Sequence, residues 1–87
     1  MTHILVVDDD HQLLRALRVA LTARDYEVTL ATNATSGMTA AGKRQPDLTI
    51  VDLGLPDMDG LAVIERIRTW STMPIIVLSA RHLVSRV

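Results

Sequence analysis

The sequence predicts an α/β domain built on a doubly wound parallel sheet. Short apolar runs alternate with longer segments of helical periodicity along the chain, which is typical of repeated β–α–β units. The apolar runs are nearly continuous in Val, Ile and Leu, as expected for parallel strands that helices cover on both faces. At 87 residues, the chain is long enough for one such domain and too short for two.

Four apolar runs are predicted to be strands. The first, ILVV, is wholly apolar and indicates a buried strand, whereas the second, YEVTLA, alternates between apolar and polar residues. LTIVDL forms the third strand, and a proline opens the fourth, PIIVLSA. The expected strands cover about residues 3–8, 26–31, 47–53 and 74–79.

The segments between these strands are predicted to be helices. The first places its leucines on one face and follows an aspartate that suits a helix cap. The second is weaker, because Gly37 and Gly42 each cost it roughly 1 kcal/mol relative to alanine. The expected helices cover about residues 11–24, 33–44 and 60–70.

Charge and composition exclude several classes of protein. A net charge of -1 argues against a nucleic-acid-binding surface, which would need clustered Lys and Arg. The chain has no cysteine for a disulfide or a thiolate metal site. No apolar run approaches the roughly 20 residues of a membrane span, and the N-terminus lacks the pattern of a signal peptide. We therefore expect a cytoplasmic protein that binds neither nucleic acid nor membrane.

Polar residues follow three of the predicted strands. The first strand ends in Asp8, Asp9 and Asp10, the third at Asp52 and the fourth at Ser79. The carboxyl ends of parallel strands share one edge of the sheet, and ligand crevices lie there. Like charges at about 4 Å repel by on the order of 4 kcal/mol per pair at an effective dielectric near 20, so a gathered set of carboxylates needs a counter-charge.

An oxygen-only cluster at this edge suits Mg²⁺, which also offsets the repulsion between carboxylates. Asp52 stands alone at its strand tip and could act as a nucleophile that forms an aspartyl phosphate. Ser79 could then donate a hydrogen bond to a phosphoryl oxygen. Single aspartates are more often caps or turn residues, and Asp10, beside a helix start, fits that role best.

Other polar residues receive structural interpretations. Asp57 and Asp59 lie in a loop rich in Gly and Pro and are expected to be solvated turn residues. His3, His11 and His82 share no metal-ligand spacing and are expected to lie at the surface.

Three motifs carry a resemblance to a known family. In order and spacing, ILVVDDD, IVDLGLPDMDG and IIVLSAR resemble the receiver domain of bacterial two-component response regulators. The segments DLGLPDMDG and LSAR are most similar to the OmpR/PhoB class of transcription regulators, and to KdpE-like members in particular. The resemblance implies a flavodoxin-like, CheY-like sheet with strand order 2-1-3-4 over the part present here.

The resemblance also implies a role for individual residues. Asp52 would be the phosphoacceptor, Ser79 the switch hydroxyl and Ala80 the small residue beside the phosphate. Mg²⁺ would be held by Asp8, Asp9, Asp52 and the backbone carbonyl of Gly54. The phosphate would come from a sensor histidine kinase, and the domain would be a signalling module with at most weak autophosphatase activity.

The chain departs from the family pattern in two respects. Asp25 stands where many relatives carry glycine in a tight turn, so the resemblance implies a positive φ there, which aspartate tolerates. Receivers have five strand–helix units, whereas this sequence predicts four strands, and the family's site lysine belongs to the fifth. Lys43 is the chain's one lysine and falls at the end of the second helix. We therefore expect residues 1–87 to be a truncated receiver without an output domain, with impaired phosphotransfer. Its fourth strand would form an apolar edge, through which we expect it to form a homodimer or oligomer.

Two other functions remain open at this point. A haloacid-dehalogenase-type phosphatase would use two aspartates separated by one residue, which Asp8 and Asp10 supply, although Gln12 departs from that signature. Alternatively, the chain would be an inert interaction fragment that folds only with a partner.

Overall fold

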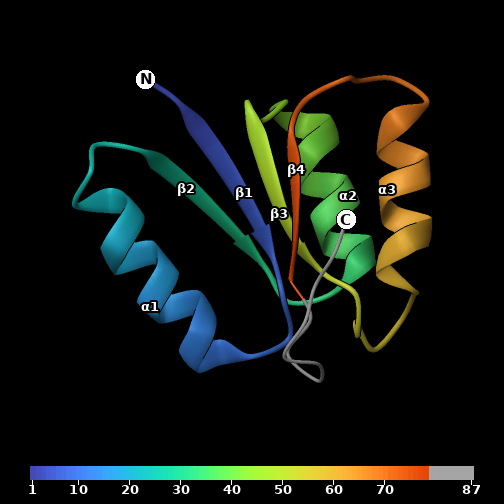
Figure 1. Ribbon diagram of the computed structural model, residues 1–87, viewed down its shortest axis with the longest axis horizontal. Coiled ribbons are helices and arrows are strands. Elements are labelled where there is room, and N and C mark those ends of the chain that lie inside the picture. Colours follow the sequence, from blue (N-terminus) through green and yellow to red (C-terminus); the bar gives the residue numbers. More distant parts are fainter. Residues whose placement is uncertain (79–87) are drawn as a thin grey trace.

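A four-stranded parallel sheet forms the centre of the molecule (Figure 1). The computed structural model describes residues 1–78. The strand order is β2-β1-β3-β4, and each neighbouring pair is parallel, which confirms the predicted sheet and its order. The strands are β1 (His3–Val7), β2 (Glu27–Ala31), β3 (Leu48–Asp52) and β4 (Ile75–Leu78).

Helices cover both faces of the sheet. These are α1 (His11–Thr22), α2 (Ala34–Lys43) and α3 (Gly60–Arg68). In Figure 1, α1 lies on the side of β2, and α2 and α3 lie together on the other side of the sheet. Because both faces are covered, the strands need apolar residues at consecutive positions, and this explains the unbroken ILVV run.

The central strand β1 contributes side chains to two separate hydrophobic cores. Ile4 and Val6 pack with Leu14 of α1 on one face. Leu5 and Val7 point to the opposite face and pack against the residues of α2 and α3. All five residues of β1 are buried, as the alternation of side chains in a strand between two helical layers requires.

Polar side chains set where each helix begins. Asp10 accepts hydrogen bonds from the N–H groups of Gln12 (3.0 Å) and Leu13 (3.2 Å), so its predicted role as the cap of α1 is confirmed. Asn33 caps α2, and Asp59 caps α3 by accepting from the N–H of Leu61 at 2.9 Å. Asp59 is exposed, as expected, and the cap of α3 is a further role that was not predicted.

The helices end earlier than expected from the sequence. In α1 the last helical residue is Thr22, because the N–H groups of Arg24 and Tyr26 both turn back to the carbonyl of Leu21. Asp25 makes this reversal with a φ of 68°, as predicted. The cap residues of α2 have extended backbones, so that helix is confined to Ala34–Lys43.

The two glycines of α2 have opposite environments. A Cβ at Gly37 would lie 2.8 Å from Cγ2 of Val7, whereas no described atom lies within 4 Å of a Cβ at Gly42. We expect Gly42→Ala to raise the free energy of unfolding by up to about 1 kcal/mol through helix propensity. Gly37→Ala should lower it, because overpacking a core costs about 1–3 kcal/mol. Urea unfolding of both variants tests this, and equal shifts in the same direction would contradict the close approach of α2 to β1.

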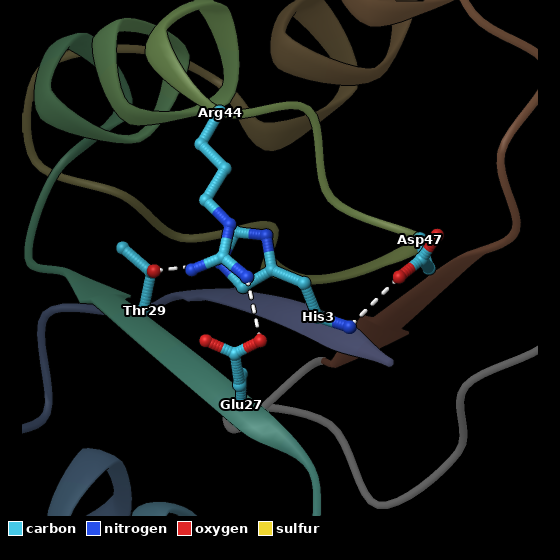
Figure 2. A network of polar contacts seen from close by, with 5 residues as sticks. All are labelled: His3, Glu27, Thr29, Arg44 and Asp47. Atoms are coloured by element: carbon cyan, nitrogen blue, oxygen red, sulfur yellow. Dashed lines mark hydrogen bonds and ion pairs between the residues drawn. The ribbon is translucent and has the colours of Figure 1, made fainter. Parts of the chain in front are cut away.

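At the amino-terminal edge of the sheet, His3 takes part in a polar network (Figure 2). The His3 side chain is buried, and its Nε2 lies 2.7 Å from Oγ1 of Thr29. Its backbone N–H donates to Oδ2 of Asp47 at 2.8 Å. The exposed Arg44–Glu27 ion pair lies over this network, at 2.7 Å. The expectation of a surface position for His3 is wrong, because the central strand buries its first residue as well.

The other two histidines are placed differently. His11, at the start of α1, is exposed as expected. His82 lies outside the described residues. Among the helices of residues 1–78, none combines the length and the apolar character that crossing a bilayer requires.

Candidate functional site

Three carboxylates come together at the carboxyl edge of the sheet. Asp8 and Asp9 follow β1, and Asp52 is the last residue of β3. One oxygen from each of these three residues lies within 4.8 Å of the others. We call this set, Asp8, Asp9 and Asp52, the acidic cluster.

Strand topology explains why these residues meet. The chain passes from β1 to β2 on one side and then crosses to β3 on the other, so β1 and β3 flank the switch point of the sheet. Val7 pairs with Val51 in the parallel register, and the next residues along the two strands are Asp8 and Asp52. The meeting of Asp8 and Asp52 at this edge was predicted from the sequence.

The members of the acidic cluster differ in their exposure. The Asp8 and Asp52 side chains are 2% and 6% exposed, whereas Asp9 is exposed. Oδ1 of Asp8 accepts a hydrogen bond from the backbone N–H of Asp10 at 2.8 Å. Oδ2 of Asp8 is buried and has no hydrogen-bond partner among the residues that the structure describes.

Burial raises the pKa of Asp8 above its ordinary value, and the nearby charges of Asp52, Asp9 and Asp10 add to the increase. The hydrogen bond from the backbone of Asp10 acts in the opposite direction without cancelling it. Burial and the neighbouring carboxylates thus disfavour the charged form of Asp8, and a cation in the cluster would offset both effects.

The donor set fits a hard divalent cation. All three side chains offer oxygen ligands, and Mg²⁺ prefers one or two carboxylates together with water. A cation here would give Oδ2 of Asp8 the partner it lacks and would offset the repulsion within the cluster. The orphaned buried oxygen is thus independent support for a metal site at this edge.

The β3–α3 loop, residues 53–59, leaves β3 directly after Asp52. The N–H of Leu53 donates to the carbonyl of Leu78 in β4 at 3.1 Å, and the N–H of Gly60 closes the base of the loop on the carbonyl of Leu53 at 3.2 Å. Gly54 lies in this loop, half-buried, two residues after Asp52. The use of its carbonyl as a metal ligand stays a prediction.

Gly60 fits against the backbone at the end of β3. A Cβ at this position would lie 2.5 Å from the carbonyl oxygen of Asp52 and 2.7 Å from Cα of Leu53. Both contacts are with backbone, so the small residue is what permits α3 to begin so close to Asp52. This role of Gly60 was not predicted from the sequence.

Asp57 lies exposed in a turn of this loop, as expected, but its contact with α2 was not predicted. Its side chain is exposed, yet its carboxylate accepts hydrogen bonds from the N–H groups of Ala34 (2.8 Å) and Thr35 (3.0 Å) and from Oγ1 of Thr35 (2.8 Å). These N–H groups hold the pKa of Asp57 below its usual range. No local spacing rule reveals this contact, because Asp57 and Ala34 are 23 residues apart in the chain.

The other predicted site residues are described only in part. Ser79 and Ala80 lie outside the described residues. Lys43 occupies the last turn of α2, whereas the first turn of that helix is the one bound to the β3–α3 loop. Asp10 is engaged as a helix cap, so the Asp8–Asp10 pair gains no support as a phosphatase site.

Comparisons with known proteins agree with this arrangement. Residues 4–86 match the family model of the response regulator receiver domain. The transcriptional regulatory protein KdpE of Mycobacterium tuberculosis (strain H37Rv) is 52% identical over 81 residues, which cover 93% of this chain and 36% of that protein. The KDP operon transcriptional regulatory protein KdpE of Escherichia coli K12 is 47% identical over 81 residues, with the same coverage. The chain thus spans about a third of the length of these relatives.

Solved structures show the same fold. The response regulator TrrA of Thermotoga maritima, in complex with Mg²⁺-BeF, superposes with a TM-score of 0.86 and 33% identity over 92% of this chain and 67% of TrrA. The complex of the histidine kinase ThkA with TrrA contains a match with a TM-score of 0.87 and 33% identity, over 99% of this chain and 76% of that one. The chemotaxis regulator CheY4 of Vibrio cholerae matches with a TM-score of 0.86 and 28% identity, over 88% of this chain and 67% of CheY4.

Proposed function

The chain belongs to the family of response regulator receiver domains of two-component systems, and we propose that it is a phosphoacceptor module in which Asp52 receives a phosphoryl group from a sensor histidine kinase. Mg²⁺ would be held by Asp8, Asp9, Asp52 and the carbonyl of Gly54. The observation that carries the proposal is the acidic cluster itself, with the unpartnered oxygen of Asp8 buried beside Asp52. The complexes of TrrA with Mg²⁺-BeF and with a histidine kinase support it by analogy.

The proposed reaction is a transfer between two side chains. A carboxylate oxygen of Asp52 attacks the phosphorus of a phosphohistidine, so that an O–P bond forms and the P–N bond breaks. The kinase imidazole leaves and takes up a proton, and Asp52 becomes an acyl phosphate. When bound, the metal ion would neutralise charge on the phosphoryl oxygens. The protein contributes a fixed position for Asp52, since β3 and the contact with Gly60 hold its backbone.

This module stores a signal, so we propose no catalytic turnover beyond a weak autophosphatase activity. Histidine kinases take their phosphate from ATP, so we place the module in the cytoplasm. The family's site lysine has no counterpart at the acidic cluster in residues 1–78, because Lys43 lies at the far end of α2. We therefore expect slow phosphorylation of this 87-residue chain.

Incubation with acetyl phosphate and Mg²⁺, followed by intact-mass spectrometry, tests the proposal. We expect the mass of one phosphoryl group to be added, slowly, in the unmodified chain and not at all in Asp52→Asn. Asp25→Asn, which removes a carboxylate at the other end of the sheet, is the matched control and should behave like the unmodified chain. Phosphate release that persists in Asp52→Asn and disappears in Asp8→Asn would instead favour a phosphatase.

We also propose that this chain self-associates through β4. Among residues 1–78, β4 pairs with β3 alone, and Ile76 on this strand is 48% exposed. A strand with an unpaired edge and exposed apolar side chains is a template for pairing with a second copy. Size-exclusion chromatography with light scattering should show dimers or larger species that Ile76→Lys reduces. Val19→Lys replaces an apolar residue of α1 that is 66% exposed, and it should not reduce them. A monomer at all micromolar concentrations would contradict the proposal.

A further inference from the structure

We propose that Asp57 is a positioning residue whose carboxylate clamps the β3–α3 loop to the first turn of α2 and thereby strengthens Mg²⁺ binding at the acidic cluster. The inference deepens the proposed function and rests on it. The hydrogen bonds that the structure describes for the Asp57 carboxylate go to Ala34 and Thr35 and not to the acidic cluster. Asp57 acts through the loop that carries Gly54 and that begins at the residue after Asp52.

The clamp uses both carboxylate oxygens. Oδ1 accepts from the N–H of Ala34, and Oδ2 accepts from the N–H and the hydroxyl of Thr35, all at 2.8 to 3.0 Å. The next free N–H of α2, on Ser36, is taken by its own cap, Asn33, at 2.8 Å. The first three N–H groups of the helix are therefore satisfied, two of them by a residue of a different loop. Residues of the β3–α3 loop and of the cap thus together stabilise the start of α2.

Charge favours the same contact. A carboxylate is stabilised at the positive end of a helix dipole. The two N–H donors also lower the pKa of Asp57, so the group is ionised at neutral pH, where the metal would bind. The clamp is thus in place under the conditions in which the site would work.

The position of the clamp within the loop gives it a role at the site. At its base the loop is fixed by the bonds of Leu53 and Gly60, and Leu55 and Met58 pack into the core. Asp57 lies between Leu55 and Met58 in the chain, and its carboxylate joins the loop to the first turn of α2 by hydrogen bonds. A loop that is ordered before the metal arrives loses less conformational freedom on binding. Residues that orient metal ligands typically change metal affinity by about 10- to 100-fold when they are removed.

The test compares two variants of one loop. Asp57→Asn removes the charge and one of the two oxygen acceptors, so the N–H groups of Ala34 and Thr35 can no longer each donate to an oxygen of their own. Asp59→Asn removes the same charge from the same loop, where Asp59 caps only α3. Mg²⁺ alone is titrated at constant ionic strength and followed by amide NMR shifts of Asp52 to Gly54, in protein shown by urea unfolding to be folded. We expect Asp57→Asn to bind Mg²⁺ about tenfold more weakly than Asp59→Asn, which is the lower end of the effect of residues that orient metal ligands. Asp57→Glu, which keeps the carboxylate, should restore most of the affinity.

The outcomes separate the inference from the function on which it rests. If the unmodified chain binds no Mg²⁺, the proposed function fails. If it binds Mg²⁺ and the Asp57→Asn and Asp59→Asn variants bind it equally, the clamp has no role in binding. Should Asp57→Asn fail to fold, Thr35→Val deletes one bond of the clamp, with Thr39→Val as control, because Thr39 bonds only within α2 at 2.9 Å. Equal affinities of those two variants would overturn the inference as well.

Discussion

Replacing Asp8 with asparagine is expected to stabilise the metal-free protein and to abolish its Mg²⁺ binding. The Asp8 side chain is 2% exposed, and one of its oxygens has no partner within residues 1–78. A buried polar group without a partner costs about 1–3 kcal/mol, and the like charges of Asp9 and Asp52 add to the cost. An asparagine keeps the oxygen that accepts from Asp10 and places an amide N–H among the remaining carboxylates. We therefore expect a gain of about 1–3 kcal/mol in the free energy of unfolding.

The pH dependence of this gain has a definite sign. Because burial raises the pKa of Asp8 in the folded state, its contribution to stability is fully present below its ordinary pKa of 3.8 and is lost as the pH rises through the raised value. The charged form of Asp8 thus destabilises the fold, and Asp8→Asn removes this charge. The difference between the two proteins should shrink as the pH is lowered, because the unmodified Asp8 then takes up a proton.

Urea unfolding at several pH values, with EDTA and then with Mg²⁺, measures both effects. Mg²⁺ should raise the stability of the unmodified chain by mass action and leave that of Asp8→Asn unchanged. Asp9→Asn is the control, since Asp9 is exposed and its replacement should give a smaller gain without metal. If metal-free Asp8→Asn unfolds at a lower urea concentration than the unmodified chain, the buried carboxylate does not destabilise the metal-free protein.

Replacing Gly60 with alanine is expected to destabilise the protein and to disturb Asp52. The added Cβ would lie 2.5 Å from the carbonyl oxygen of Asp52 and 2.7 Å from Cα of Leu53. These are backbone atoms at the end of a buried strand, so no side-chain rotation relieves the contact. We expect a loss of about 3 kcal/mol, at the upper end for overpacking, together with weaker Mg²⁺ binding.

Gly42→Ala is the matched control for Gly60→Ala, because it adds the same methyl group where no described atom lies within 4 Å. Urea unfolding gives the stability of both variants, and amide NMR shifts of Asp52 and Leu53 report the local disturbance. If Gly60→Ala is as stable as the unmodified chain and leaves these shifts in place, the close packing of α3 on the end of β3 is not a constraint on the site.

The sheet and the acidic cluster could be predicted from the sequence because they follow from repeating patterns. Continuous apolar runs between helical segments indicate a parallel sheet, and the carboxyl-edge rule places Asp8 and Asp52 together. The cap at Asp10 follows from a local rule for helix starts. In each case the signal lies within a few residues or in a regular period.

The features that were missed depend on contacts between distant segments. His3 is buried because its strand is central, and its partner Thr29 is 26 residues away. Asp57 lies in a segment whose composition indicates a turn, and only the arrangement of α2 beside the β3–α3 loop gives it two backbone donors. The role of Gly60 likewise depends on the distance between α3 and β3, which no sequence period reports.

Locating the phosphoryl group in the chain decides whether Asp52 is the phosphoacceptor of a Mg²⁺-dependent site. The chain is incubated with acetyl phosphate, with Mg²⁺ or with EDTA, and then treated with borohydride, which reduces an aspartyl phosphate to homoserine. Peptide mass spectrometry then identifies the converted residue. We predict conversion of Asp52 alone, and only with Mg²⁺. Conversion of Asp8 or Asp9, or equal conversion of Asp52 in EDTA, would contradict the account.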